Sequence, residues 1–288
     1  MLRISNFLPN AQQQTSMLSV TVYADTSTAQ LAIWYLRRDG MNLGDFFERN
    51  SEVALAFSGG VDSAYLLYAA IEYGAQVKAY YVKSVFQPQF EFDDALRLAK
   101  ELGADMQVLS VDVLAASTIA GNPVNRCYYC KKVIFTTIAQ AAEKDGYKIL
   151  IDGTNASDDA GDRPGMKALK ELSVRSPLRE CGLTKDDIRR LSKEAGLFTW
   201  DKPAYACLAT RIPAGENITE EKLEKTERAE AYLSSLGFSD FRVRMFGNAA
   251  RVQVREEQLR LVLDKRREIV DELKKFYDAV LLDLEVRE

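Results

Sequence analysis

The 288-residue sequence contains no histidine. This absence excludes every site that needs an imidazole, whether as a metal ligand or as a general base near neutral pH. Cysteine is also scarce, and its four residues are too few for the disulfide framework of a small secreted domain. We therefore expect a cytoplasmic protein in which paired cysteines serve redox or metal chemistry.

Long apolar runs and a strong excess of one charge are missing as well. No stretch approaches the roughly 18 apolar residues of a membrane-spanning helix, and residues 1–16 lack the apolar core of a signal peptide. The net charge is −4 at pH 7, whereas a dedicated nucleic-acid binder concentrates basic side chains on one surface. We therefore expect a soluble protein that binds neither membrane nor nucleic acid.

Strand-like and helix-like segments alternate between residues 51 and 155. Short apolar runs occupy residues 52–57, 76–84, 105–113 and 147–155. The segments between them space their apolar residues as helices do. This alternation predicts an α/β fold with a doubly wound parallel sheet. A further helix is predicted over 183–197, with Thr184 as its N-cap and Asp187 completing a capping-box-like pattern.

The last third of the chain has another pattern. A long helix is predicted over 219–237, two strands joined by a Gly-Asn turn over 241–254, and a single helix over 256–276. We predict a smaller α+β domain at 210–288 and a nucleotide-binding domain at 46–209. Residues 1–45 form an N-terminal extension that we leave unassigned, with Met17 as an alternative start.

The connection between the first predicted strand and helix reads SGGVDS, residues 58–63. Two glycines let the backbone approach an anion, and the helix start turns unpaired N–H groups toward it. No Gly-Lys-Ser/Thr follows, so this is not a Walker loop. The hexapeptide predicts a phosphate site, and the alternative is a plain turn that Asp62 caps.

The four cysteines offer several kinds of site. Cys127 and Cys130 form a C-x-x-C pair, which suits a redox disulfide, half of a metal site or two ordinary thiols. A closed zinc site needs four ligands, and without histidine only Cys181 and Cys207 remain to complete it. If Cys181 is a small semi-buried residue, three thiolates suit an iron–sulfur cluster with one open iron.

Several motifs together resemble one known family. They are SGGVDS, RCYYCKK, DGTNASDDAGDRPG, VRSPL, WDKPAYACLATRIPAGENIT and ERAEAYL with FRVRMFG, in that order. The first is similar to the PP-loop of ATP pyrophosphatases. The whole set, over residues 45–285, resembles the LarE-type sulfur transferases (pyridinium-3,5-biscarboxylic acid mononucleotide sulfurtransferases). This resemblance implies an adenine nucleotide alpha hydrolase-like fold.

The resemblance also implies an activity. The family uses ATP and Mg²⁺ to adenylate the carboxylates of its pyridinium mononucleotide substrate. It then converts them to thiocarboxylates for the nickel-pincer cofactor of lactate racemase. Some members sacrifice a cysteine sulfur, and others hold a [4Fe-4S] cluster on three cysteines. The pattern here, Cys127, Cys130 and Cys207, resembles the cluster-bearing branch, and a homo-oligomer is implied.

Site residues follow partly from the motifs and partly from the resemblance. We expect ATP to be bound by Ser58, Gly59, Gly60, Val61, Asp62, Ser63, Gly153 and Thr154, with Asp62 near the metal. By resemblance, phosphate and metal are bound by Arg211, Glu230, Arg242 and Arg244. An alternating strand puts Arg242 and Arg244 on one face, either as a phosphate clamp or as a solvated edge.

Three rival functions stay open at this point. A tRNA thiolase would share the PP-loop and the cysteines, although it would need a basic surface for RNA. A sacrificial sulfur donor would use Cys207 itself. A nucleotide-binding or iron–sulfur regulator would bind ATP without releasing pyrophosphate.

Overall fold

The computed structural model describes residues 41–158 and 164–287. Most of the predicted extension, including Met17, therefore lies outside the described residues. The short helix α2 (Leu43–Arg49) begins the described part and is held by a capping box in which Asn42 and Asp45 bond reciprocally. No helix in the described ranges combines the length and apolar character needed to cross a membrane.

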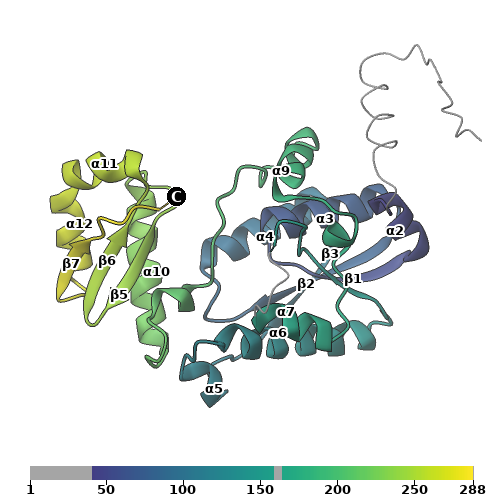
Figure 1. Cartoon of the computed structure of the whole chain (residues 1–288), viewed down its shortest axis with the longest axis horizontal. Helices are drawn as coiled ribbons and strands as arrows, with labels where there is room; N and C mark the ends of the chain where they lie inside the picture. The colour runs from purple at the N-terminus through teal and green to yellow at the C-terminus, as the bar shows by residue number, and fades with distance from the viewer. Residues whose placement is uncertain (1–40, 159–163, 288) are drawn as a thin grey trace, which may run out of the picture. The chain divides into compact units, whose positions relative to one another are not determined.

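Four parallel strands form the larger sheet (Figure 1), in the order β3-β2-β1-β4. They are β1 (Glu52–Ala56), β2 (Gln76–Lys83), β3 (Asp105–Ser110) and β4 (Leu150–Asp152). The α/β fold class with a parallel sheet is confirmed. The fourth strand is much shorter than the run predicted over 147–155.

Helices cover both faces of this sheet because successive strand residues point to opposite sides. Val53 and Leu55 pack in the cluster that holds α3 and α4, whereas Ala54 packs with Ile138 and Ala142 of α6. The helices of this region are α3 (Val61–Glu72), α4 (Gln89–Glu101), α5 (Ser117–Ala120), α6 (Arg126–Lys144), α7 (Pro164–Glu171), α8 (Pro177–Glu180) and α9 (Lys185–Glu194). This is the double winding that the sequence pattern predicted.

The strand order changes direction at β1. The chain moves from β1 through β2 to β3 on one side, and β4 then joins the other side of β1. Ligands in such sheets bind beyond the carboxyl ends of the strands at this switch point. The SGGVDS loop leaves β1 at that place, so the fold itself brings the loop to the expected ligand site.

A second sheet follows in the last third of the chain. Its strands β5 (Arg242–Phe246), β6 (Ala249–Gln253) and β7 (Ala279–Leu282) lie in the order β5-β6-β7. β5 and β6 are antiparallel and joined at Gly247, whose φ of 57° favours glycine. The predicted hairpin is thus confirmed, and β7 adds in parallel to β6. The domain boundaries stay a prediction.

The helices around the second sheet depart from the prediction in one place. They are η1 (Leu208–Arg211), α10 (Glu220–Ser235), η2 (Glu256–Gln258), α11 (Leu259–Asp264) and α12 (Arg266–Leu273). The single helix predicted over 256–276 is therefore wrong, because the chain breaks at Lys265, where φ is −93° and ψ is 7°. Spacing of apolar residues continues across such a break, so the periodicity did not reveal it.

Candidate active site

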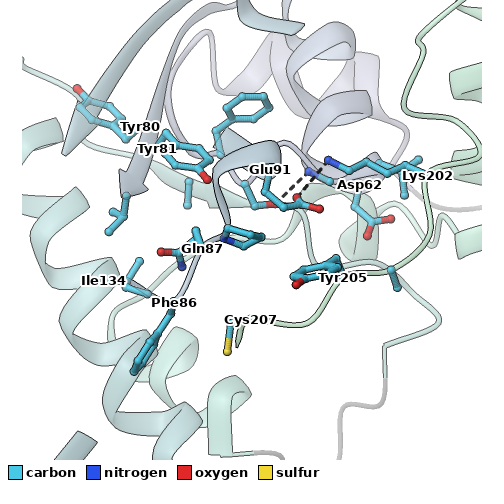
Figure 2. A pocket seen from close by; sticks show the side chains of 18 of the residues that line it. Asp62, Tyr80, Tyr81, Phe86, Gln87, Glu91, Ile134, Lys202, Tyr205 and Cys207 are labelled. Carbon is cyan, nitrogen blue, oxygen red and sulfur yellow. Dashed lines mark hydrogen bonds and ion pairs between the residues drawn. The ribbon is translucent and has the colours of Figure 1, made fainter. Parts of the chain in front are cut away.

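A cavity of about 390 Å³ lies beyond the carboxyl ends of β1 and β2 (Figure 2). Its walls come from the SGGVDS loop, the end of β2, the start of α4, α6 and the segment before η1. The lining includes Ser58, Gly60, Val61, Asp62, Tyr80, Tyr81, Phe86, Glu91, Phe135, Lys185, Lys202, Tyr205 and Cys207. The predicted ATP loop and one of the predicted cysteines therefore share one cavity.

The loop's shape depends on two serines and a glycine. The hydroxyls of Ser58 and Ser63 lie 3.0 Å apart, and Ser63 Oγ donates to the carbonyl of Gly60 at 3.2 Å. Gly59 has φ of 73°, and a Cβ there would lie 2.9 Å from Cβ of Ala95 in α4. A side chain at position 59 would push the loop away from α4.

Gly153 and Thr154 directly follow β4 but do not line the cavity. A Cβ at Gly153 would lie 2.8 Å from the amide nitrogen of Ser63, so the missing side chain lets β4 contact the start of α3. Thr154 Oγ1 donates to Asp152 Oδ2 at 2.5 Å. Gly153 thus lies against the start of α3, and the predicted ATP-binding role of Gly153 and Thr154 stays a prediction.

Asp62 is paired with a lysine that the motifs did not reveal. Lys185 Nζ lies 2.6 Å from Asp62 Oδ2, while Asp62 Oδ1 is buried with no hydrogen-bond partner among the described residues. Lys185 opens α9 directly after Thr184, whose predicted capping box with Asp187 is confirmed. A lone carboxylate oxygen beside a phosphate loop fits Mg²⁺, which is bound through one or two carboxylates plus substrate phosphates.

Residues 200–207, here called the strap, carry Lys202, Tyr205 and Cys207 past the cavity (Figure 2). Arg189 holds the start of the strap by donating to the carbonyls of Trp200 at 2.7 Å and Lys202 at 2.9 Å. Lys202 Nζ lies 3.2 Å from Glu91 Oε2. The strap is thus fixed to both α9 and α4.

Three of the four cysteines gather around the guanidinium of Arg126. Arg126 Nη1 lies 3.7 Å from Cys207 Sγ, and electrostatic interaction with the thiols of Cys127, Cys130 and Cys207 helps raise the pKa of Arg126 against the opposing effect of burial. Burial raises the pKa of Cys130 to about 11, partly opposed by Arg126. Cys181 lies apart, buried in the core of the larger sheet.

Whether the three cysteines can hold an iron–sulfur cluster depends on their chemistry and on their geometry. Three thiols near one point are suitable donors. Within residues 41–158 and 164–287, however, no group of three or more Cys, Asp or Glu side chains is arranged to hold a metal ion. Arg126 lies among the thiols, so their arrangement here does not fit a cluster.

The residues predicted from the later segment form a buried charged group. Arg211 Nε lies 2.7 Å from Glu230 Oε1, with 0% and 5% of the two side chains exposed. Glu230 also accepts hydrogen bonds from the hydroxyl of Tyr205 and the amide of Val243. Arg211 Nη1 donates to the carbonyl of Ala206 in the strap at 3.1 Å.

Arg242 and Arg244 reach toward backbone carbonyls. Arg242 Nη2 donates to Ala204 O at 2.6 Å, and Arg244 Nη1 donates to Thr210 O at 2.8 Å. Burial, with the neighbouring charges of Arg211 and Arg287, lowers the pKa of Arg242 to about 10. Arg242 is 4% exposed, so a solvated edge does not describe it.

A second cavity of about 420 Å³ also borders the strap. Arg242, Glu230, Ser239 and Asp240 line it together with α4 and α10 residues. The two cavities share a set of lining residues, namely Pro88, Glu91, Lys202, Pro203 and Tyr205. The strap and the start of α4 therefore form a common wall.

Comparison with known proteins gives the chain its family. No family model matches. The pyridinium-3,5-bisthiocarboxylic acid mononucleotide synthase of Lactiplantibacillus plantarum is 36% identical over 72% of this chain and 76% of its own length. The chain belongs to the LarE family. An uncharacterised protein of Synechocystis is 39% identical to this LarE-family chain, over 76% of the chain and 82% of the relative.

A more distant relationship concerns the nucleotide-binding region. The tRNA-specific 2-thiouridylase MnmA of a Thermotoga species is 25% identical over 52% of this chain and 54% of its own length. A match over half of each protein relates the LarE-family chain to another PP-loop protein. It carries no information on the substrate.

Proposed function

We propose that this LarE-family protein is an ATP-dependent sulfur transferase. It would form a thiocarboxylate on pyridinium-3,5-biscarboxylic acid mononucleotide, for the nickel-pincer cofactor of lactate racemase. The observation that carries the proposal is the shared cavity: the SGGVDS loop and the thiol of Cys207 line the same 390 Å³ space. An ATP-activated carboxylate would thus form beside a sulfur atom.

The first half-reaction activates the substrate. ATP would lie with its phosphates at residues 58–63, and Mg²⁺ would be held by Asp62 and the phosphates. A carboxylate oxygen attacks the α-phosphorus, and the bond to the bridging oxygen of pyrophosphate breaks. Pyrophosphate leaves with the electron pair, and an acyl-adenylate remains. The second cavity, with Arg242, Glu230 and Arg211 near it, would bind the mononucleotide.

The second half-reaction brings in sulfur. In the cluster-bearing form that the resemblance implies, Cys127, Cys130 and Cys207 would be the residues that hold a [4Fe-4S] cluster, and the cluster would supply sulfur at the oxidation level of sulfide. As the three thiols lie here, with Arg126 among them, they do not fit that cluster. Attack of sulfide on the acyl carbon would displace AMP with its electron pair and leave the thiocarboxylate.

A second candidate is favoured by the position of Cys207, which lines the cavity while Cys127 and Cys130 do not. Here the Cys207 thiolate itself attacks the acyl carbon, and AMP leaves with its electron pair. A base then removes the Cα proton, and the Cβ–S bond breaks with its electrons going to sulfur. The products are the thiocarboxylate and a dehydroalanine at position 207.

One experiment tests the proposal and separates the two sulfur sources. Wild type, Cys207→Ala and the control Cys181→Ala are reconstituted anaerobically with iron and sulfide, then supplied with ATP and the pyridinium mononucleotide. Thiocarboxylate formation by wild type and Cys181→Ala, but not Cys207→Ala, supports the function. Iron retained by wild type supports the cluster, whereas protein lighter by H₂S after one turnover supports sacrifice. Absence of any thiocarboxylate with wild type would overturn the proposed function.

A further inference from the structure

Lys202 lies on the wall between the two cavities. Its side chain lines both of them, and only 12% of it is exposed. Its Nζ lies 3.2 Å from Glu91 Oε2 and 2.8 Å from Asp94 Oδ2. An ammonium group carries three donors, and Nζ is buried with no hydrogen-bond partner among the described residues, so donors remain for a ligand.

The backbone of Lys202 is held in place. Arg189 donates to its carbonyl at 2.9 Å, and the next residue is Pro203, whose ring restricts the chain. Lys202 N donates to Thr199 O at 3.1 Å. Its side chain can therefore change partners while the main chain keeps its position.

The carboxylate beside Lys202 is only partly satisfied. Glu91 Oε1 is buried and has no hydrogen-bond partner among the described residues, and burial raises the pKa of Glu91. Glu91 lines both cavities, whereas Asp94 lines neither. The pair Lys202–Glu91 thus faces the place where ligands in the two cavities would meet, and Asp94 supports it from behind.

We infer that Lys202 is a catalytic residue of the adenylation half-reaction. Its ammonium contacts an α-phosphate oxygen of ATP in the first cavity while a carboxylate of the mononucleotide approaches from the second. This inference rests on the proposed function. The bonds are those given above: the carboxylate oxygen joins the α-phosphorus, pyrophosphate departs with its electron pair, and no oxidation occurs. The positive charge of the ammonium stabilises the negative charge that develops on the phosphoryl oxygens.

The test compares Lys202→Met and Lys202→Arg with two controls. Lys193→Met alters a lysine whose Nζ lies 4.4 Å from the Trp200 ring centroid in the strap, and Lys265→Met alters a lysine that pairs with Glu268 and lines neither cavity. Pyrophosphate release is measured in single turnovers with ATP and the pyridinium mononucleotide. ATP affinity is measured separately by calorimetry, and folding by urea unfolding.

Lys202→Met is expected to slow pyrophosphate release by about 10²–10³, the effect of losing one preorganised charge-stabilising donor. ATP affinity should change far less, Lys202→Arg should recover part of the rate, and both controls should stay near wild type. A fast Lys202→Met, or a Lys193→Met that is equally slow, would overturn the inference and leave Lys202 as a structural link between the strap and α4. If Lys202→Met does not fold, the test rests on Lys202→Arg. Pyrophosphate release by Lys202→Arg that is no faster than in the absence of enzyme would overturn the inference. If wild type itself releases no pyrophosphate, the proposed function fails first.

Discussion

Arg211 and Glu230 form a two-point ion pair inside the protein. Nε lies 2.7 Å from Oε1, and Nη2 lies 3.1 Å from Oε2. The carboxylate belongs to α10 and the guanidinium to η1, the short helix that follows Cys207. The pair therefore fixes the end of the strap against the helix that packs on the second sheet.

Glu230→Ala should destabilise the fold strongly. The substitution leaves the buried Arg211 charge without its carboxylate, a loss that costs about 3–5 kcal/mol in other proteins. Urea unfolding measures the change, with Glu224→Ala as the control because its side chain is 72% exposed. Equal stability of the two variants would show that Arg211 finds compensation from Thr210 or the Ala206 carbonyl.

Gly153→Ala should damage the nucleotide loop from behind. The added Cβ would lie 2.8 Å from the amide nitrogen of Ser63, so either β4 or the start of α3 must shift. We expect ATP affinity measured by calorimetry to fall about tenfold or more, since a displacement of this kind changes the loop's phosphate contacts. Gly121→Ala, outside the cavity and without a positive φ, serves as the control and should bind ATP normally.

Arg189→Met should loosen the strap without removing a group that lines the cavity. The change deletes the donors to the Trp200 and Lys202 carbonyls, and each such bond contributes about 0.5–1.5 kcal/mol. Limited proteolysis should then cut between residues 198 and 207 faster than in wild type. The neighbouring Arg190 pairs with Glu194 on the exposed side of α9, so Arg190→Met should be cut no faster than wild type.

Asp145 should contribute to the loss of folding stability at acidic pH. Hydrogen bonds from Lys78 and the Tyr80 hydroxyl, both at 2.7 Å, lower the pKa of Asp145 below its usual value. A lowered folded-state pKa contributes stability that is present above the unfolded pKa and is lost as pH falls through the folded one. Asp145→Asn should therefore lose less stability than wild type between neutral pH and about pH 3. Asp264→Asn, 64% exposed, should follow the wild-type curve.

Local signals in the sequence predicted much of the fold. Alternating strand and helix patterns gave the parallel sheet, Thr184 marked the start of α9, and the Gly-Asn pair marked the β5–β6 turn. Each of these signals acts within a few residues, where propensity and hydrogen bonding are local. The helix break at Lys265 was not predicted, because the helical spacing of apolar residues continues unchanged through it.

The site was predicted less completely for the same reason. The SGGVDS motif predicted the residues of the loop itself. Lys185 lies 123 residues after Asp62 in the sequence, and Lys202 lies further still, yet both line the cavity. The sequence around these two lysines does not distinguish a lysine that lines a cavity from one on the surface. Arg242 and Arg244 were placed on one strand face correctly by alternation, yet their carbonyl partners depend on tertiary packing. The binding roles of all the predicted site residues stay predictions.

The common wall has a thermodynamic consequence. Pro88, Glu91, Lys202, Pro203 and Tyr205 face both cavities, so any movement of these residues on filling one cavity changes the other. Thermodynamic linkage then requires the effect to be reciprocal. If a ligand in the first cavity changes the affinity of the second cavity for its ligand by some factor, that second ligand changes the affinity of the first cavity by the same factor. A single measured ratio would therefore describe the cooperation of the two sites in both directions.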